Sequence, residues 1–238
     1  MAHRPIRPKT QLAVLVFALV FPSLMTWVYF IALSGRREAG VAYAVGKLVQ
    51  FGFPPIWLRW VEGRWLRPAP PSGKGMILAS FFGALVVSLL LIRYFAGLKG
   101  SGMLAGTATE IRQKIEPLGL ATPMSFLGLA AFYCIAHSLL EEYYWRWFVF
   151  GRLRDLSHPA LAVLISSLGF MSHHVILVYR FIDGSWGAVG LFSLCVAAGG
   201  AAWAWIYHRS GSLYGPWWSH GMVDAGLMII GYDLLWGL

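Results

Sequence analysis

Seven apolar runs, each long enough to cross a lipid bilayer as a helix, constrain this chain more than any other feature. They cover about residues 11–33, 39–60, 75–98, 122–150, 157–180, 184–207 and 212–236. Because backbone amides find no water in hydrocarbon, crossing segments form helices or closed barrels, and runs of about 20 residues select helices. Only 12% of the residues are charged, against about 25% in soluble domains. We predict an all-α, polytopic membrane protein with about seven transmembrane helices, and leave an eighth open.

The loops between these runs are too short for a second folded unit, so we expect one continuous membrane domain. We divide it into residues 1–120, with the N-terminal helices and a polar connection, and 121–238. Within the connection, mixed charge from Thr107 to Pro117 predicts a short amphipathic helix at the membrane surface. Pro54-Pro55 should kink or end the second helix.

The first run exceeds the roughly 7 to 15 residues of a signal-peptide core, which predicts a retained helix. Cys134 and Cys195 lie inside apolar runs, and we expect both to be free thiols.

The net charge of +9 comes mainly from Lys and Arg between the apolar runs. This distribution indicates membrane topology and contact with lipid headgroups, and no nucleic-acid partner. With a cytoplasmic N-terminus, the outer segments hold six basic residues and the inner segments ten, which favours that orientation. The inner ones are Arg4, Arg7, Lys9, Arg59, Arg64, Arg67, Lys74, Arg152, Arg154 and Arg209.

Ionisable side chains inside apolar helices are expensive and are candidates for function. In the first such group, Glu142 and Arg146 share one helix face, whereas Glu141 points with His137. An ion pair between Glu142 and Arg146 would leave Glu141 free to act as a general base on water. The alternative is that these charges lie among headgroups at the cytoplasmic end.

Two further groups lie on later helices. Phe170 and His174 stand four residues apart on one stripe, and because His173 and His174 point about 100° apart, we expect one of the two to enter a given site. His220 and Asp224 are one turn apart, so the carboxylate can fix the imidazole tautomer or share a water or metal ion with it. A packing histidine and a hydrogen-bonded pair joining two helices are the structural alternatives.

The three groups occur in order on three separate helices, and together they resemble the motifs of the CPBP family of intramembrane peptidases. This family includes the CAAX prenyl endopeptidases and the Abi-type proteins. The matching segments are Glu141-Glu142-x-x-x-Arg146, Phe170-x-x-x-His174 and His220-x-x-x-Asp224, with similar flanks at Ile165-Ser166-Ser167 and over residues 209–214. The resemblance covers about residues 120–238. Trp147 stands where many members have glycine, and Asp224 where asparagine is common.

The resemblance implies a catalytic core in the last four helices that hydrolyses a peptide bond without a covalent acyl-enzyme. The bond would lie near the C-terminus or membrane anchor of a protein or peptide substrate, in a bacterial inner membrane. Glu141 would activate the water, His174 and His220 would stabilise the oxyanion, and Asp224 would orient His220. The supporting residues would be Glu142, Arg146, His173 and Phe170.

Zinc is an open alternative, held by Glu141, His174, His220 and Asp224. The sequence lacks His-Glu-x-x-His in this region, and we favour a metal-free site. Intramembrane Glu, His and Asp also build ion and proton pathways, so a transporter is an alternative function, although no inverted repeat is visible. A catalytically silent scaffold of the same fold is another.

The predicted helix boundaries raise one conflict. At 1.5 Å per residue, Glu141 would lie ~7 Å to the cytoplasmic side of the midplane and His174 ~9 Å to the outer side. A shared site therefore requires different helix boundaries or tilt.

Overall fold

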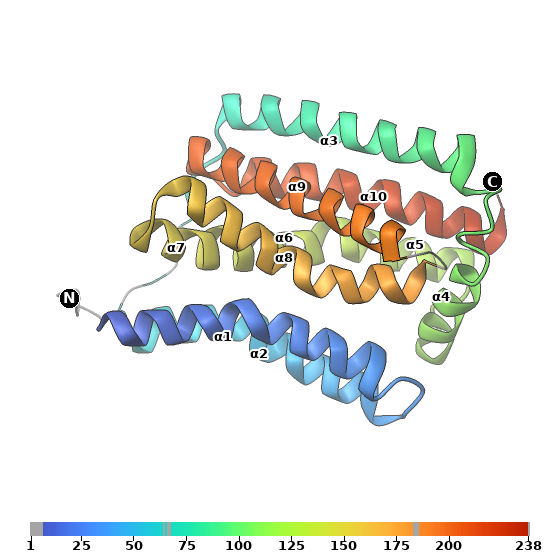
Figure 1. The fold of residues 1–238 in the computed structure, drawn as a ribbon, viewed down its shortest axis with the longest axis horizontal. Helices are drawn as coiled ribbons and strands as arrows, with labels where there is room; N and C mark the ends of the chain where they lie inside the picture. The colour runs from blue at the N-terminus through green and yellow to red at the C-terminus, as the bar shows by residue number, and fades with distance from the viewer. Residues whose placement is uncertain (1–6, 64, 66–67, 183–185, 238) are drawn as a thin grey trace.

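A computed structural model describes residues 7–63, 65, 68–182 and 186–237, and the regular structure in these ranges is helical (Figure 1). The long helices form a bundle (Figure 1). They are α1 (Pro8–Trp27, extended by a π-turn at Val28–Ala32), α2 (Glu38–Trp60), α3 (Gly73–Arg93, extended at Tyr94–Leu98), the composite helix over Pro123–Leu156, α8 (Pro159–Phe181), α9 (Trp186–Ser210) and α10 (Tyr214–Trp236). The predicted start of the sixth run, at residue 184, falls outside the described residues.

Within the described ranges, five helices are long and apolar enough to cross a membrane. They are Pro8–Ala32, Gly73–Leu98, Pro123–Leu156, Pro159–Phe181 and Trp186–Ser210. The predicted count of seven spans is therefore not confirmed, because α2 and α10 do not belong to this group. Both nevertheless lie in the bundle, α2 beside α1 and α10 beside α3 (Figure 1). Gly75 and Gly215 let α3 and α10 approach closely, since a Cβ at Gly215 would lie 2.9 Å from the Gly75 carbonyl oxygen.

Pro54-Pro55, which we expected to kink or end the second helix, do not end it, because α2 continues to Trp60. Each proline removes only one backbone hydrogen bond, and side-chain contacts hold the turn that follows. The Trp57 indole donates a 2.9 Å hydrogen bond to Glu62, which also pairs with Arg152 of another helix. The end of α2 is thereby attached to the bundle.

The short helix predicted between Thr107 and Pro117 is present as α4 (Thr107–Ile115), followed by a 3₁₀ turn at Glu116–Leu118. It packs beside the end of α8, where Arg180 pairs with Glu110 at 2.7 Å and Thr107 donates to the Phe181 carbonyl. The Lys114 ammonium lies 4.5 Å from the ring centre of Tyr29. Burial lowers the pKa of Lys114, and the neighbouring Arg180 acts in the same direction.

The composite helix consists of α5 (Pro123–Phe132), a π-turn (Tyr133–His137), α6 (Ser138–Glu142), a second π-helical stretch (Tyr143–Phe150) and α7 (Gly151–Leu156). It ends six residues beyond the predicted boundary at 150, so its midpoint moves toward Glu141. This shift reduces the predicted difference in depth between Glu141 and His174 by about 5 Å. π-turns are often found at functional sites, and here they flank the short segment that carries both glutamates.

The N-terminal helices, which carry none of the motifs, pack directly against the helices that do. The Tyr144 hydroxyl donates to the Ala18 carbonyl at 2.8 Å, and Ser23 and Ser172 are hydrogen bonded at 2.6 Å. Aromatic side chains fill the core beside them, among them Trp145, Phe148, Phe170 and Trp203. Cys134 and Cys195 are free thiols, as predicted.

Gly221→Ala should destabilise the protein, because a Cβ at this position would lie 2.4 Å from the Cys134 carbonyl oxygen of the composite helix. Overpacking of this kind costs about 1–3 kcal/mol, more than the helix propensity that alanine adds. Thermal unfolding in detergent measures the effect. The matched control is Gly199→Ala, whose Cβ would lie 3.8 Å from Trp203 and should cost nothing. Equal unfolding temperatures for the two variants would contradict this packing.

Candidate active site

The candidate site lies where α6, α8 and α10 meet inside the bundle. Glu141 and Glu142 end α6, His173 and His174 lie on α8, and His220 and Asp224 lie on α10. Both glutamates are buried, Glu141 with 2% of its surface exposed and Glu142 with none. The predicted alternative for these glutamates, a position among headgroups, does not fit this burial.

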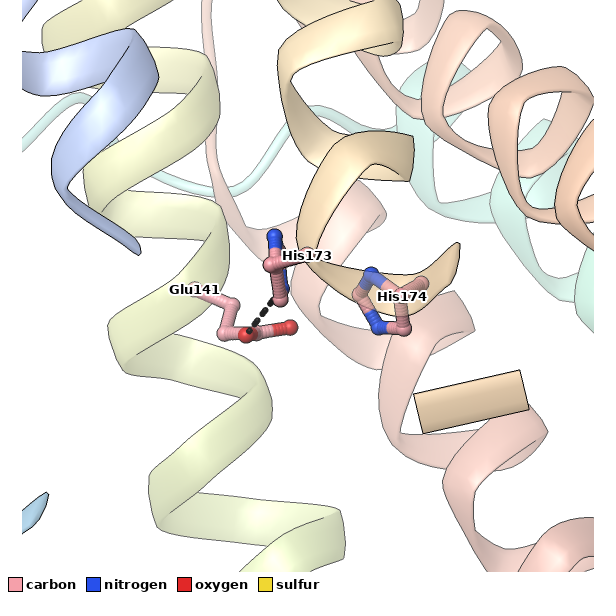
Figure 2. Close-up of side chains that lie close together, drawn as sticks. All are labelled: Glu141, His173 and His174. Carbon is pink, nitrogen blue, oxygen red and sulfur yellow. Dashed lines mark ion pairs between the residues drawn. The ribbon is translucent and has the colours of Figure 1, made fainter. Parts of the chain in front are cut away.

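Three histidines from three segments surround the Glu141 carboxylate. The Nε2 atom of His173 lies 3.5 Å from Oε1, that of His137 lies 3.8 Å from Oε1, and that of His220 lies 3.8 Å from Oε2. Figure 2 shows the carboxylate facing His173, with His174 beside it. The shared face of His137 and Glu141, one turn apart, is confirmed.

Only one of the two adjacent histidines was expected to enter the site, and the structure brings in both. Glu141, His173 and His174 each offer a ligand atom within 4.8 Å of the others. The Glu141 carboxylate is within reach of both imidazoles. The 100° between the two side-chain directions on the helix therefore does not exclude either histidine from the site. The His174 Nδ1 donates to the Phe170 carbonyl at 2.9 Å, which leaves Nε2 as the ring nitrogen that can serve the site.

Glu142 forms a second centre within the site. Arg146 forms the predicted ion pair with it: the Nη2 atom donates a 3.1 Å hydrogen bond to Oε1, and the Nε atom lies 2.9 Å from Oε2. The guanidinium is fully buried. The Nδ1 of His220 donates to the same carboxylate at 2.9 Å. Asp224, which we expected to orient His220, instead lies 3.7 Å from the Nε2 of that ring. The prediction failed because the spacing of residues within α10 gives no information on contacts with a neighbouring helix, and Glu142 lies on such a helix.

Two tryptophans that sequence reasoning missed hold the histidine rings. Trp203 of α9 stacks on His220, with ring centres 4.2 Å apart and planes 14° apart. Trp145 stacks on His173 at 5.6 Å, with planes 5° apart. Trp145 could have been found from the sequence, because it lies within the first motif. Trp203 could not, because nothing in the α9 sequence distinguishes it from the other aromatic residues. Trp147, at the position where glycine is common in the resembled family, stacks on Tyr143.

The residues that could hold a metal differ from the predicted set of Glu141, His174, His220 and Asp224. The possible ligand atoms that lie close enough together to share one ion belong to Glu141, His173 and His174. A carboxylate and two imidazoles are ligands that zinc accepts, and three protein ligands with one open position are typical of catalytic zinc. The donor set therefore fits such an ion chemically.

A helical bundle with a buried glutamate among histidines of separate helices is the arrangement expected of an intramembrane protease. Residues 123–226 match a protein-family model described as Type II CAAX prenyl endopeptidase Rce1-like. This segment runs from the start of α5 into α10 and contains all the predicted site residues. Searches of curated proteins and of solved structures found no match. The match confirms the kind of family that the motifs predicted, because it makes this part of the chain similar to the CAAX-type intramembrane proteases.

Proposed function

We propose that this protein is an intramembrane endopeptidase that hydrolyses a peptide bond near the C-terminus or membrane anchor of a protein substrate. The observation that carries the proposal is the pairing pattern of the two glutamates. Glu142 is neutralised by Arg146, whereas Glu141 has only histidines as near neighbours, at 3.5 to 3.8 Å. A water molecule that hydrogen bonds to the carboxylate and to one of these imidazoles would be the nucleophile.

In the proposed reaction, Glu141 takes a proton from this water as the water oxygen attacks the substrate carbonyl carbon. The carbon–nitrogen bond then breaks as Glu141 returns the proton to the departing amine. His174 and His220 stabilise the oxyanion, an electrostatic contribution worth several kcal/mol. His173, closest to Glu141, orients the carboxylate and the water.

The remaining residues position these groups. Glu142 fixes the His220 ring through its Nδ1, and Arg146 balances the charge of Glu142. The Arg146 guanidinium also lies 4.7 Å from the ring centre of Phe170, a contact that stabilises a buried cation. Asp224, beside the His220 Nε2, adds negative charge that favours a charged imidazole.

Zinc remains an alternative to this metal-free reaction. Glu141, His173 and His174 would hold it, and when bound it would polarise the carbonyl and activate water as a Lewis acid. We favour the metal-free site because the sequence lacks His-Glu-x-x-His and leaves Glu141 free to act as the base.

The proposed orientation places the N-terminus in the cytoplasm of a bacterium, with the protein in the inner membrane. The basic residues that support it include Arg59, Arg152 and Arg154, near the ends of α2 and α7. Three others used in that count, Arg4, Arg64 and Arg67, lie outside the described residues.

The protein reconstituted in liposomes, with reporter peptides carrying a C-terminal membrane-associated segment, tests this function. Mass spectrometry of the products should show one cut near the C-terminus, absent from liposomes without protein. A transporter would instead leave the reporters intact and dissipate an ion or proton gradient. Intact reporters without such flux would favour the silent scaffold.

A further inference from the structure

Lys47 is a lysine in the middle of α2, within the part of the chain that carries no family motif. It lies nine residues from Glu38 and thirteen from Trp60, or about 13 Å from the nearer end of the helix. This is farther than a lysine side chain reaches to place its charge in the headgroup layer. A cation in the middle of a helix of an apolar bundle is costly and is a candidate for function.

The surroundings of Lys47 are aromatic and neutral. Its ammonium donates a 3.2 Å hydrogen bond to the Gln50 Oε1 and lies 5.4 Å and 5.3 Å from the ring centres of Tyr43 and Phe51. Among the described residues, no carboxylate lies within ion-pair distance of Lys47. Phe51 in turn packs against Tyr144, with ring centres 6.2 Å apart. Because Tyr144 follows Glu141 by three residues in the composite helix, this contact places Lys47 at the edge of the candidate site.

Gln50 gives a second, independent indication of a missing acceptor. Its side chain is 1% exposed, and its Nε2 has no hydrogen-bond partner among the described residues. The amide orientation is fixed because lysine has donors only, so the oxygen must face Lys47 and the NH₂ group must face away. Two adjacent donors without an anion suit a carboxylate, which offers two acceptor oxygens.

The other cation at the site is not available for such a ligand. Arg146 has no exposed surface and is paired with Glu142. Lys47, in contrast, is only partly buried and retains N–H donors. A substrate whose cleaved bond lies near its C-terminus brings a terminal carboxylate into the bundle, where that charge needs a cation.

We propose that Lys47, oriented by Gln50, binds the free C-terminal carboxylate of the substrate tail and makes the enzyme selective for tails that end in a free acid. This inference rests on the proposed peptidase function and extends it to a selectivity residue outside the family match.

The test uses two reporter peptides that differ only at the C-terminus, a free acid in one and an amide in the other. The reconstituted wild-type protein should cleave the acid with the higher kcat/KM. Lys47→Met should lower kcat/KM for the acid by roughly 10- to 100-fold, the value of one charge-assisted hydrogen bond. Cleavage of the amide should change little, which also shows that the variant is folded.

Two matched variants sharpen the comparison. Lys47→Arg keeps the cation and should retain a preference for the acid, and Lys9→Met, an exposed lysine at the start of α1, should behave as wild type. Equal cleavage of acid and amide by the wild type, or an unchanged preference in Lys47→Met, would overturn the proposal.

A binding measurement separates this inference from the peptidase function. Fluorescent acid and amide tail peptides are titrated onto Glu141→Gln protein with and without Lys47→Met. Tighter binding of the acid that depends on Lys47 supports carboxylate recognition even where no cleavage occurs. If neither reporter is cut by the wild type, the peptidase proposal fails, whereas equal binding of both peptides would refute the role of Lys47.

Discussion

Glu141→Gln is expected to lower the rate of peptide hydrolysis by about a thousandfold or more, within the range of general-base contributions. Glutamine has nearly the same size, so the packing beside His173 should persist while the proton acceptor is lost. Single-turnover kinetics on the reconstituted protein measures the effect, free of product release.

The matched control for this change is Glu38→Gln, an exposed glutamate at the start of α2. It should cleave at the wild-type rate. Glu141→Asp keeps the charge but withdraws the carboxylate by one methylene, so an intermediate rate is expected. Full activity in Glu141→Gln would show that another group activates the water.

Arg146→Met is expected to destabilise the protein by about 3–5 kcal/mol, the usual cost of leaving one partner of a buried ion pair unpaired. The Glu142 carboxylate has no exposed surface, and without the guanidinium its remaining hydrogen-bond partner is His220. Thermal or denaturant unfolding in detergent measures the loss.

Arg154→Met is the matched control. Arg154 is exposed on α7, which follows Arg146 in the same composite helix, and should tolerate the change. The double variant Glu142→Gln with Arg146→Met should recover part of the stability, because it removes the uncompensated charge. An Arg146→Met protein as stable as the Arg154→Met protein would contradict the energetic role of the pair.

Contacts within one helix were predictable from the sequence. Glu142 with Arg146 and His137 with Glu141 follow from the four-residue spacing, which determines which side chains share a face. The motifs that contain them also predicted the family of residues 123–226, because residue types and spacing are all that such a comparison needs.

Contacts between helices were not predictable in this way. The His220–Glu142 bond and the stacking of Trp203 on His220 depend on how α6, α9 and α10 rotate and cross. The periodicity of a helix determines which side chains share a face, but it does not determine which neighbouring helix that face contacts. For the same reason His173 appeared secondary from sequence, although it lies closest to Glu141.

Helix boundaries were predictable only in part. The prolines of α2 do not end it, because Trp57 and Glu62 hold the turn that follows, and these side-chain contacts leave no local signature. The composite helix likewise extends to Leu156 through a segment with several charges. In both helices tertiary packing outweighs local propensity.

The most direct test of a water-activating Glu141 is a single turnover in ¹⁸O-labelled water with excess reconstituted protein. If Glu141 acts as the base, the new carboxylate of the product contains one ¹⁸O from the first turnover, and Glu141 stays unlabelled. Unlabelled product together with ¹⁸O in the peptide that contains Glu141 would contradict this, because it would show that the glutamate itself attacks the carbonyl.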